Sequence, residues 1–297
     1  MNLLMFSGAA PADFPVDGWT ALIVGSERDD RGGEARKYAE DSGLLVFSML
    51  YDSKSLAYNF DGKVAGVDEL GVLVDVIQNH KVLIDSTTLG FIEILLLIRA
   101  YKISSVDRLN ILYIEPLEYA SQRSRGVLHG RDFFLSEKSE LFEGVPGAAV
   151  MITKHREKKA VLLVGYEGDR LQKVLEQTPL EASDCNILLG VPAFQAGWEM
   201  NSYANVVSEL DERRITSVIY AGATNPKAVY RELQRVLKSC GPQEKMILIP
   251  IGTKPHAIGA AIFSVDYPEI GIIYDNPAKK KGRTKEVGKW HLFHIGK

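Results

Sequence analysis

The sequence predicts an α/β protein built on parallel sheets, and two patterns support this fold class. Apolar runs of about five residues alternate with amphipathic segments, which is typical of strands buried on both faces and joined by helices. The alternation then starts again in the middle of the chain, which indicates two successive α/β units. The 297 residues, 46% apolar and 25% charged, have the composition of an ordinary globular protein of one or two domains.

In the first half of the chain, short apolar runs predict four strands, at 20–25, 44–51, 81–85 and 109–116. Helices are expected between them at 33–43 and 90–102. The second helix is the most apolar stretch of the chain, but Glu93 and Arg99 interrupt it and it is too short to span a bilayer. We therefore expect no membrane association.

In the second half, strands are expected at the start of 158–177 and at 186–194, 216–222, 245–252 and 270–277. Asn225 or Thr224 is expected to cap a helix that has Pro226 at its first position. The segments 21–41 and 161–177 share one pattern: a strand that ends in Val-Gly, then an acidic residue, then a charged helix. A duplicated Rossmann-like unit and convergent βα chemistry both explain this similarity.

These patterns predict Rossmann-like parallel sheets in two α/β domains. The expected N-terminal domain covers 1–121 and the expected C-terminal domain covers 150–297. The segment 122–149 has a mixed composition with turn signals, and we interpret it as a crossover or linker.

The strongest candidate site is the corner between the strand at 245–252 and the small-residue helix that follows it. Gly252 permits a sharp turn or the close approach of a ligand, and Pro255 fits the first turn of a helix. The N-terminus of such a helix favours an anion, and Lys254 adds a positive charge next to it. Thr253 and His256 complete the candidate anion site, for which an ordinary capped helix is the alternative.

A second candidate site lies at the end of the strand 81–85, where Asp85 is followed by Ser86, Thr87 and Thr88. One of these hydroxyls is expected to cap the next helix. The set of three is also compatible with a cradle for a phosphate or a ribose.

A third candidate follows the first strand of the second half. Tyr166 has a ring that can stack on a base, Glu167 can accept hydrogen bonds from ribose hydroxyls, and Arg170 can clamp a phosphate. A charged loop with a surface ion pair is the simpler interpretation of the same residues.

The segment "IPIGTKPHAIGAA" (249–261) resembles the Gly-Thr-Lys corner of CARF domains, which are Rossmann-like sensors of cyclic oligoadenylates in prokaryotic antiviral systems. The resemblance implies that Lys254 lies at a nucleotide pocket, with contacts from Gly252 and Thr253. In ring nucleases of this family the lysine assists phosphodiester cleavage. The resemblance covers about a dozen residues, and Ile251 stands where the family usually has a second glycine.

The same resemblance implies a partner for the lysine in the loop after the first strand of the domain, at 166–169. Pro255 and His256 depart from the pattern of the family, and no nuclease or HEPN effector segment is recognisable. These departures leave the identity of the ligand open. They do not affect the prediction that this corner binds an anion.

Other motifs are absent from the sequence. There is no P-loop, no G-x-G-x-x-G fingerprint, no G-x-S-x-G elbow and no H-E-x-x-H. His291 and His294 are three residues apart, so on a strand they would face opposite sides, which argues against a metal site. We expect neither a metal nor a resident cofactor.

The net charge of −3 argues against a dedicated nucleic-acid binder, although 279–289 is locally basic. Cys185 and Cys240 are too few for a disulfide framework or a zinc cluster. The N-terminus lacks the features of a signal peptide, and we expect a cytoplasmic protein.

Three functions remain open at this stage. The first is a binding protein or sensor for a nucleotide or another phosphorylated molecule. The second is an enzyme in which Lys254 stabilises negative charge while His256, Asp85 or Glu167 moves the proton. The third is a subunit of a homodimer or larger complex, with 279–289 contacting nucleic acid or an acidic partner.

Overall fold

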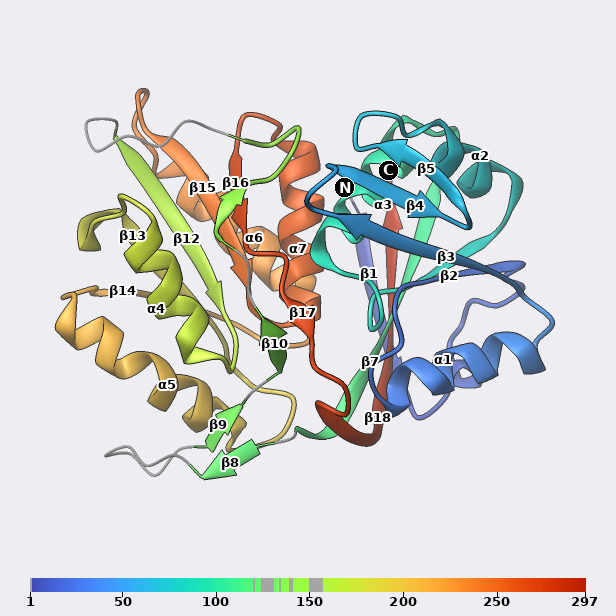
Figure 1. Cartoon of the computed structure of the whole chain (residues 1–297), viewed down its shortest axis with the longest axis horizontal. Helices are drawn as coiled ribbons and strands as arrows, with labels where there is room; N and C mark the ends of the chain where they lie inside the picture. The colour runs from blue at the N-terminus through green and yellow to red at the C-terminus, as the bar shows by residue number, and fades with distance from the viewer. Residues whose placement is uncertain (1, 120, 124–130, 134, 139–140, 150–156) are drawn as a thin grey trace. The chain divides into compact units, whose positions relative to one another are not determined.

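A computed structural model describes residues 2–119, 121–123, 131–133, 135–138, 141–149 and 157–297 (Figure 1). It confirms the α/β fold class and divides the chain into two compact units. Unit 1 combines Met1–Ala120 with Lys279–Lys297, and unit 2 is Ser121–Ala278. The last segment, which the sequence analysis placed in the second domain, supplies a strand to unit 1. The expected linker 122–149 lies partly outside the described residues.

Unit 1 is built on an eight-stranded sheet in the order β1-β18-β7-β6-β2-β3-β4-β5. The strands β7, β6, β2 and β3 are parallel, and both flanks of the sheet are antiparallel. In that order the strands span Asn2–Gly8, Thr284–Gly296, Arg108–Tyr119, Val82–Asp85, Ala21–Val24, Leu45–Asp52, Ala57–Phe60 and Lys63–Gly66. The sequence analysis predicted the four parallel strands but not β1, β4, β5 or β18.

Helices cover the sheet of unit 1. They are α1 (Asp30–Asp41), α2 (Gly71–Asn79) and α3 (Phe91–Ile103), with a short 3₁₀ turn at Pro11–Asp13. The small residues Ala35 and Ala39 of α1 pack on a core that includes Leu22 of β2 and Leu292 of β18. Helix α3 is buried almost all round, which explains why its sequence is apolar without a polar face.

Unit 2 is built on a six-stranded sheet in the order β11-β16-β15-β12-β13-β14. In that order the strands span Glu143–Gly144, Gly271–Tyr274, Lys245–Ile251, Lys158–Val164, Cys185–Gly190 and Ser217–Ala221. All neighbours are parallel except β11 and β16. The chain therefore runs outward from β12 through β13 to β14 and then returns to the other side of β12, so β12 and β15 form a topological switch point.

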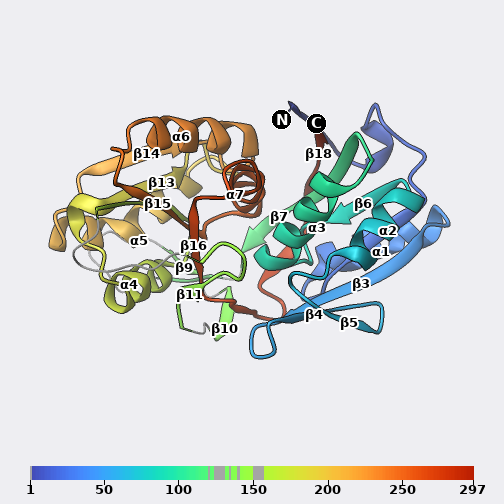
Figure 2. The ribbon, with the colours of Figure 1, turned by 90° about the horizontal axis from the view of Figure 1, so that it is seen from above.

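Among the described residues, helices connect the parallel strands of unit 2, and all of them except α5 were predicted. They are α4 (Gly168–Gln177), α5 (Trp198–Glu212), α6 (Pro226–Lys238) and α7 (Lys254–Asp266). Figure 2 shows α4 and α5 on one side of this sheet and α6 on the other. The minor elements are β8 (Ser121–Arg123), β9 (Arg131–Phe133), β10 (Ser136–Lys138), β17 (Ala278–Lys279) and a 3₁₀ turn at Ala182–Asp184.

Helices α6 and α7 pack closely against each other. Asn225 caps α6 by accepting a hydrogen bond from the amide of Ala228 at 2.8 Å, as the sequence predicted. A Cβ atom added at Gly259 of α7 would lie 2.6 Å from the carbonyl oxygen of Pro226. Glycine at this position therefore lets the backbone of α7 approach that of α6.

In the part of the chain that the structure describes, no helix combines the length and the apolar character needed to cross a membrane.

The α6–α7 contact predicts opposite effects for two glycine-to-alanine substitutions. Gly259→Ala should lower the free energy of unfolding by about 1–3 kcal/mol, because the new methyl group meets the backbone of α6. Gly33→Ala in α1 should raise it by roughly 0.5–1 kcal/mol, because nothing lies within 4 Å of its Cβ and alanine favours a helix. Urea unfolding followed by circular dichroism measures both. Equal effects of the two substitutions would contradict the described packing.

Candidate functional site

The loops after β12 and β15 touch at the switch point of unit 2. A Cβ atom added at Gly165, directly after β12, would lie 3.4 Å from Cα of Gly252. One added at Gly252 would lie 3.0 Å from the carbonyl oxygen of Leu163. A side chain at Gly252 would therefore push the two loops apart, and glycine allows their backbones to approach.

Thr253 begins α7 and ties it to a third loop. Its hydroxyl oxygen accepts a hydrogen bond from the amide of His256 at 3.4 Å, which makes Thr253 the N-cap of the helix. The same hydroxyl donates to the carbonyl oxygen of Ala223 at 2.8 Å, in the loop after β14. Pro255 occupies the first turn, as predicted, and half-buried Lys254 is the first residue of the helix.

His256 is completely buried below this corner. Its Nε2 lies 3.1 Å from the carbonyl oxygen of Gly222, so Nε2 carries the proton and donates it. Burial lowers the pKa of His256 to about 4, although hydrogen bonds to the backbone of Gly222 and Ala221 oppose this shift. Nδ1 has no hydrogen-bond partner among the described residues. A Cβ atom added at Gly252 would lie 3.5 Å from this nitrogen, which places Nδ1 under the loop after β15.

Arg170, the predicted phosphate clamp, holds α4 to the sheet. Its Nε donates to Oδ2 of Asp275 at 2.9 Å, its Nη2 donates to Oδ1, and its Nη1 donates to the carbonyl oxygen of Ile251 at 3.3 Å. Asp275 directly follows β16 and is fully buried. The carboxylate holds the pKa of Arg170 above its ordinary value against the effect of burial. Sequence reasoning did not pair these residues, which are 105 positions apart.

Tyr166 and Glu167 also have partners within unit 2. Tyr166 is buried and meets Trp198 edge-on, with 5.9 Å between the ring centroids. Glu167 accepts hydrogen bonds from the amides of Leu135 at 3.0 Å and Ser136 at 2.9 Å. Stacking of a base on Tyr166 and binding of a ribose by Glu167 stay predictions.

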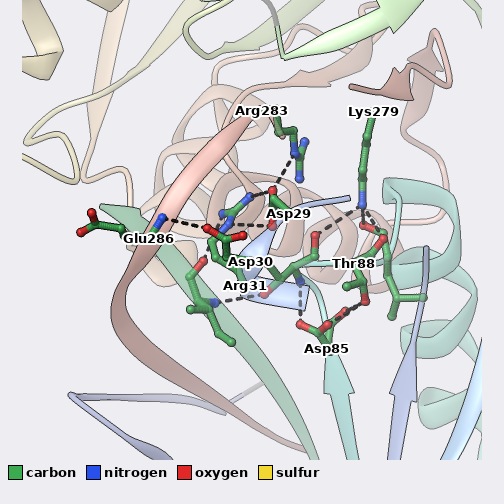
Figure 3. A network of polar contacts seen from close by, with 11 residues as sticks. Asp29, Asp30, Arg31, Asp85, Thr88, Lys279, Arg283 and Glu286 are labelled. Carbon is green, nitrogen blue, oxygen red and sulfur yellow. Dashed lines mark hydrogen bonds and ion pairs between the residues drawn. The ribbon is translucent and has the colours of Figure 1, made fainter. Parts of the chain in front are cut away.

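The second predicted corner, after β6 in unit 1, is a closed polar network (Figure 3). The buried carboxylate of Asp85 accepts hydrogen bonds from the amide of Thr87 at 2.9 Å and the hydroxyl of Thr88 at 2.7 Å. Burial raises the pKa of Asp85 above its ordinary value, against the opposing effect of these bonds.

The three hydroxyls of this corner bind the backbone of neighbouring strands and loops. Ser86 Oγ donates to Leu112 O at 2.7 Å, Thr87 Oγ1 accepts from Ile114 N at 3.1 Å, and Thr88 Oγ1 accepts from Gly25 N at 2.8 Å. Asp85 and these hydroxyls belong to unit 1, whereas Lys254 and His256 belong to unit 2. In unit 1 the chain runs from β2 to β3 and returns to β6 on the other side of β2, so β2 and β6 form a second switch point. The structure thus divides the predicted site residues between two switch points, and a ligand cradle at the hydroxyls stays a prediction.

Lys279, in the locally basic segment 279–289, completes the network of unit 1 (Figure 3). Its ammonium group donates to the carbonyl oxygens of Thr87 at 3.4 Å, Leu89 at 2.8 Å and Thr88. Three residues lie between Lys279 and Arg283, and two of them are the exposed Lys280 and Lys281.

Arg283 binds the N-terminus of α1. Its Nε lies 3.2 Å from Oδ2 of Asp29, which also pairs with Arg31 at 2.7 Å. Burial alone would raise the pKa of Asp29, but Arg31 and Arg283 together lower it to about 2. The two basic residues Lys279 and Arg283 are therefore structural within unit 1, and the exposed lysines of this segment remain as candidates for contact with an acidic partner.

The described residues contain no group of three or more His, Cys, Asp or Glu side chains placed to hold a metal ion. Comparison of the chain with protein-family models, curated proteins and solved structures finds no match.

Burial of His256 predicts how the stability of the protein depends on pH. The unfolded chain binds a proton at this residue near pH 6.5 and the folded chain only near pH 4, so the free energy of unfolding falls as the pH drops through this window. The contribution of His256 is roughly 3 kcal/mol. His256→Gln keeps a donor for Gly222 and should flatten the slope of stability against pH between 6.5 and 4. Urea titrations at several pH values measure this slope, and an unchanged slope would show that His256 is not the group that titrates.

The three carbonyl contacts of Lys279 predict a role in stability. Lys279→Met should lower the free energy of unfolding by about 1–3 kcal/mol, since buried carbonyl groups lose a charged donor. Lys281→Met, at an exposed neighbour, should change it by less than about 0.5 kcal/mol. Denaturant unfolding of both variants makes the comparison, and equal effects would refute the structural role of Lys279.

Proposed function

We propose that unit 2 binds a nucleotide or another phosphorylated ligand at the switch point between β12 and β15, with Lys254 as the charged contact. The strand order of unit 2 carries this proposal, because it brings together the loops that follow β12 and β15. In open parallel sheets, ligands bind outside the carboxyl ends of the strands at such a point.

Charge favours an anion at this place. Helix α4 begins at Gly168 after the loop of β12, and α7 begins at Lys254 after the loop of β15. The partial positive charge of each helix N-terminus adds to the formal charge of Lys254. The Thr253 cap already uses the amide of His256, so the lysine side chain and the loop backbone are the contacts that we assign to the ligand.

Binding is better supported than cleavage. A phosphodiester-cleaving enzyme needs an acid–base group at the reacting atoms beside Lys254. His256 is fully buried and neutral near pH 7, its Nε2 is engaged with Gly222, and Asp85 belongs to unit 1. The third candidate, Glu167, already accepts hydrogen bonds from the amides of Leu135 and Ser136 and from the Ser136 hydroxyl. We therefore propose a sensor or carrier, and the resemblance of 249–261 to CARF domains makes cyclic oligoadenylates, and a role in antiviral defence, the specific form of this proposal to test.

The test is a thermal-shift screen of the purified chain against mono-, di- and cyclic nucleotides and cyclic oligoadenylates. A ligand that binds the folded state at a hundred times its Kd stabilises it by about 2.7 kcal/mol, which raises Tm by ~5 °C or more. Lys254→Ala should remove most of this shift. Lys238→Ala, at an exposed lysine in the last turn of α6, should retain it.

Two outcomes would overturn the proposal. No shift with any of these ligands would exclude nucleotides as the ligand class. A shift that survives in Lys254→Ala would place the binding site elsewhere in the chain.

A further inference from the structure

Ser7, His291 and Glu115 form a hydrogen-bonded chain in unit 1. Ser7 Oγ lies 2.7 Å from Nδ1 of His291, and Nε2 of His291 lies 2.7 Å from Oε1 of Glu115. The residues come from the neighbouring strands β1, β18 and β7, and 284 positions separate Ser7 from His291. None of the contacts described at the two switch points involves these residues.

The carboxylate fixes the direction of the hydrogen bonds. An ionised carboxylate only accepts hydrogen bonds, so Nε2 of His291 carries a proton and donates it to Glu115. In the neutral imidazole Nδ1 is then an acceptor, and the hydroxyl of Ser7 donates to it. The hydroxyl proton therefore already points at a base, which is the arrangement that activates a serine.

The strands hold the three side chains on one face of the sheet. Ser7 is the register partner of His291, which is the register partner of Tyr113, and Glu115 follows Tyr113 by two residues on the same face. The rings of Tyr113 and Phe293 flank the imidazole at 6.1 and 6.2 Å, within 25° and 5° of its plane. These stacked rings fix the orientation of the imidazole.

A β-bulge in β18 lies opposite Glu115. The register of β18 against β7 shifts between Val287 and Trp290, opposite Glu115. A Cβ atom added at Gly288 in this bulge would lie 3.1 Å from Cβ of Glu115, so glycine lets the backbone of β18 approach this residue. The irregularity in β18 is thus centred on Glu115, one of the three hydrogen-bonded residues.

The three hydrogen-bonded residues differ in their burial. Glu115 is 4% exposed and His291 is 5% exposed, whereas Ser7 lies on the edge strand β1 and is exposed. The hydrogen-bonded residues therefore run from a buried carboxylate and imidazole to a serine on an exposed edge strand. A serine that only stabilised the sheet would not need this polar chain behind it.

We propose that Ser7, His291 and Glu115 are a nucleophile–base–orienter triad that reacts with activated carboxylic esters. Ser7 Oγ forms a bond to the carbonyl carbon, its proton passes to Nδ1 of His291, and Glu115 stabilises the resulting imidazolium. The bond from carbonyl carbon to the alcohol oxygen breaks, and the alcohol leaves with the proton from Nδ1. Water then attacks the acyl-serine, gives its proton to Nδ1, and releases the acid as Ser7 regains its hydrogen.

Two features distinguish this triad from the familiar serine hydrolases. The serine contacts Nδ1 and the carboxylate contacts Nε2, which exchanges the roles of the two ring nitrogens. Ser7 lies in an edge strand rather than at a strand-to-helix elbow, in keeping with the absence of G-x-S-x-G from the sequence.

The test treats the full-length chain with a fluorophosphonate, a probe that forms a phosphorus–oxygen bond to an activated serine as fluoride leaves. Peptide mass spectrometry should find the adduct on Ser7. Ser7→Ala should abolish it, and Glu115→Gln, which keeps the shape of the side chain, should slow labelling by about tenfold or more. Ser48→Ala, at an exposed serine of β3, is the matched control and should label like the unmodified protein.

Absence of an adduct at Ser7 would overturn the proposal, as would a labelling rate that Glu115→Gln leaves unchanged. The melting temperature of each variant is measured first, so that loss of labelling is read only from folded protein. His291→Gln should also abolish labelling, because it removes the base; if this variant does not fold, the labelling rate of Glu115→Gln decides the question by itself.

Discussion

Backbone amides and carbonyl groups at the ends of buried strands cannot reach water, so the protein must supply their partners. In unit 1 the hydroxyl of Thr88 accepts from the amide of Gly25, and Lys279 donates to the three carbonyl groups that precede α3. In unit 2 the hydroxyl of Thr253 donates a hydrogen bond to a carbonyl oxygen of the loop after β14, and Nε2 of His256 donates to the carbonyl oxygen before it. Several polar residues whose sequence pattern predicted a ligand site therefore form hydrogen bonds that stabilise the fold.

The two switch points differ in where their cations lie. In unit 1 the segment that begins at Lys279 lies on the loop after β6, and Arg283 pairs with Asp29 at the start of α1. In unit 2 the bidentate pair of Arg170 and Asp275 holds α4 in place, and Lys254 is the first residue of α7. We place the proposed phosphorylated ligand in unit 2 because Lys254 and the N-termini of α4 and α7 follow the strands of its switch point.

The sequence predicted the parallel strands and most of the helices between them, because continuous apolar runs and capping residues are local signals. It did not predict α2 or α5. It did not predict β18, since a basic segment followed by alternating residues reads as a loop and its partners β1 and β7 lie far away in the chain. For the site, it identified Gly252 and Lys254 from their place after a strand. It could not show that Asp275 holds Arg170 or that Ser7 meets His291, because these contacts depend on which distant strands become neighbours.

Unit 1 is assembled from two stretches of chain that are separated by the whole of unit 2. As the chain leaves the ribosome, β1 lacks its sheet neighbour, because β18 is made only after the whole of unit 2. Unit 2, which is continuous in sequence, is complete before that strand emerges, and domains generally fold as units during synthesis. Until then β1 and the outer side of β7 present unpaired backbone, so the nascent protein passes through an interval in which it is exposed to aggregation and to capture by chaperones.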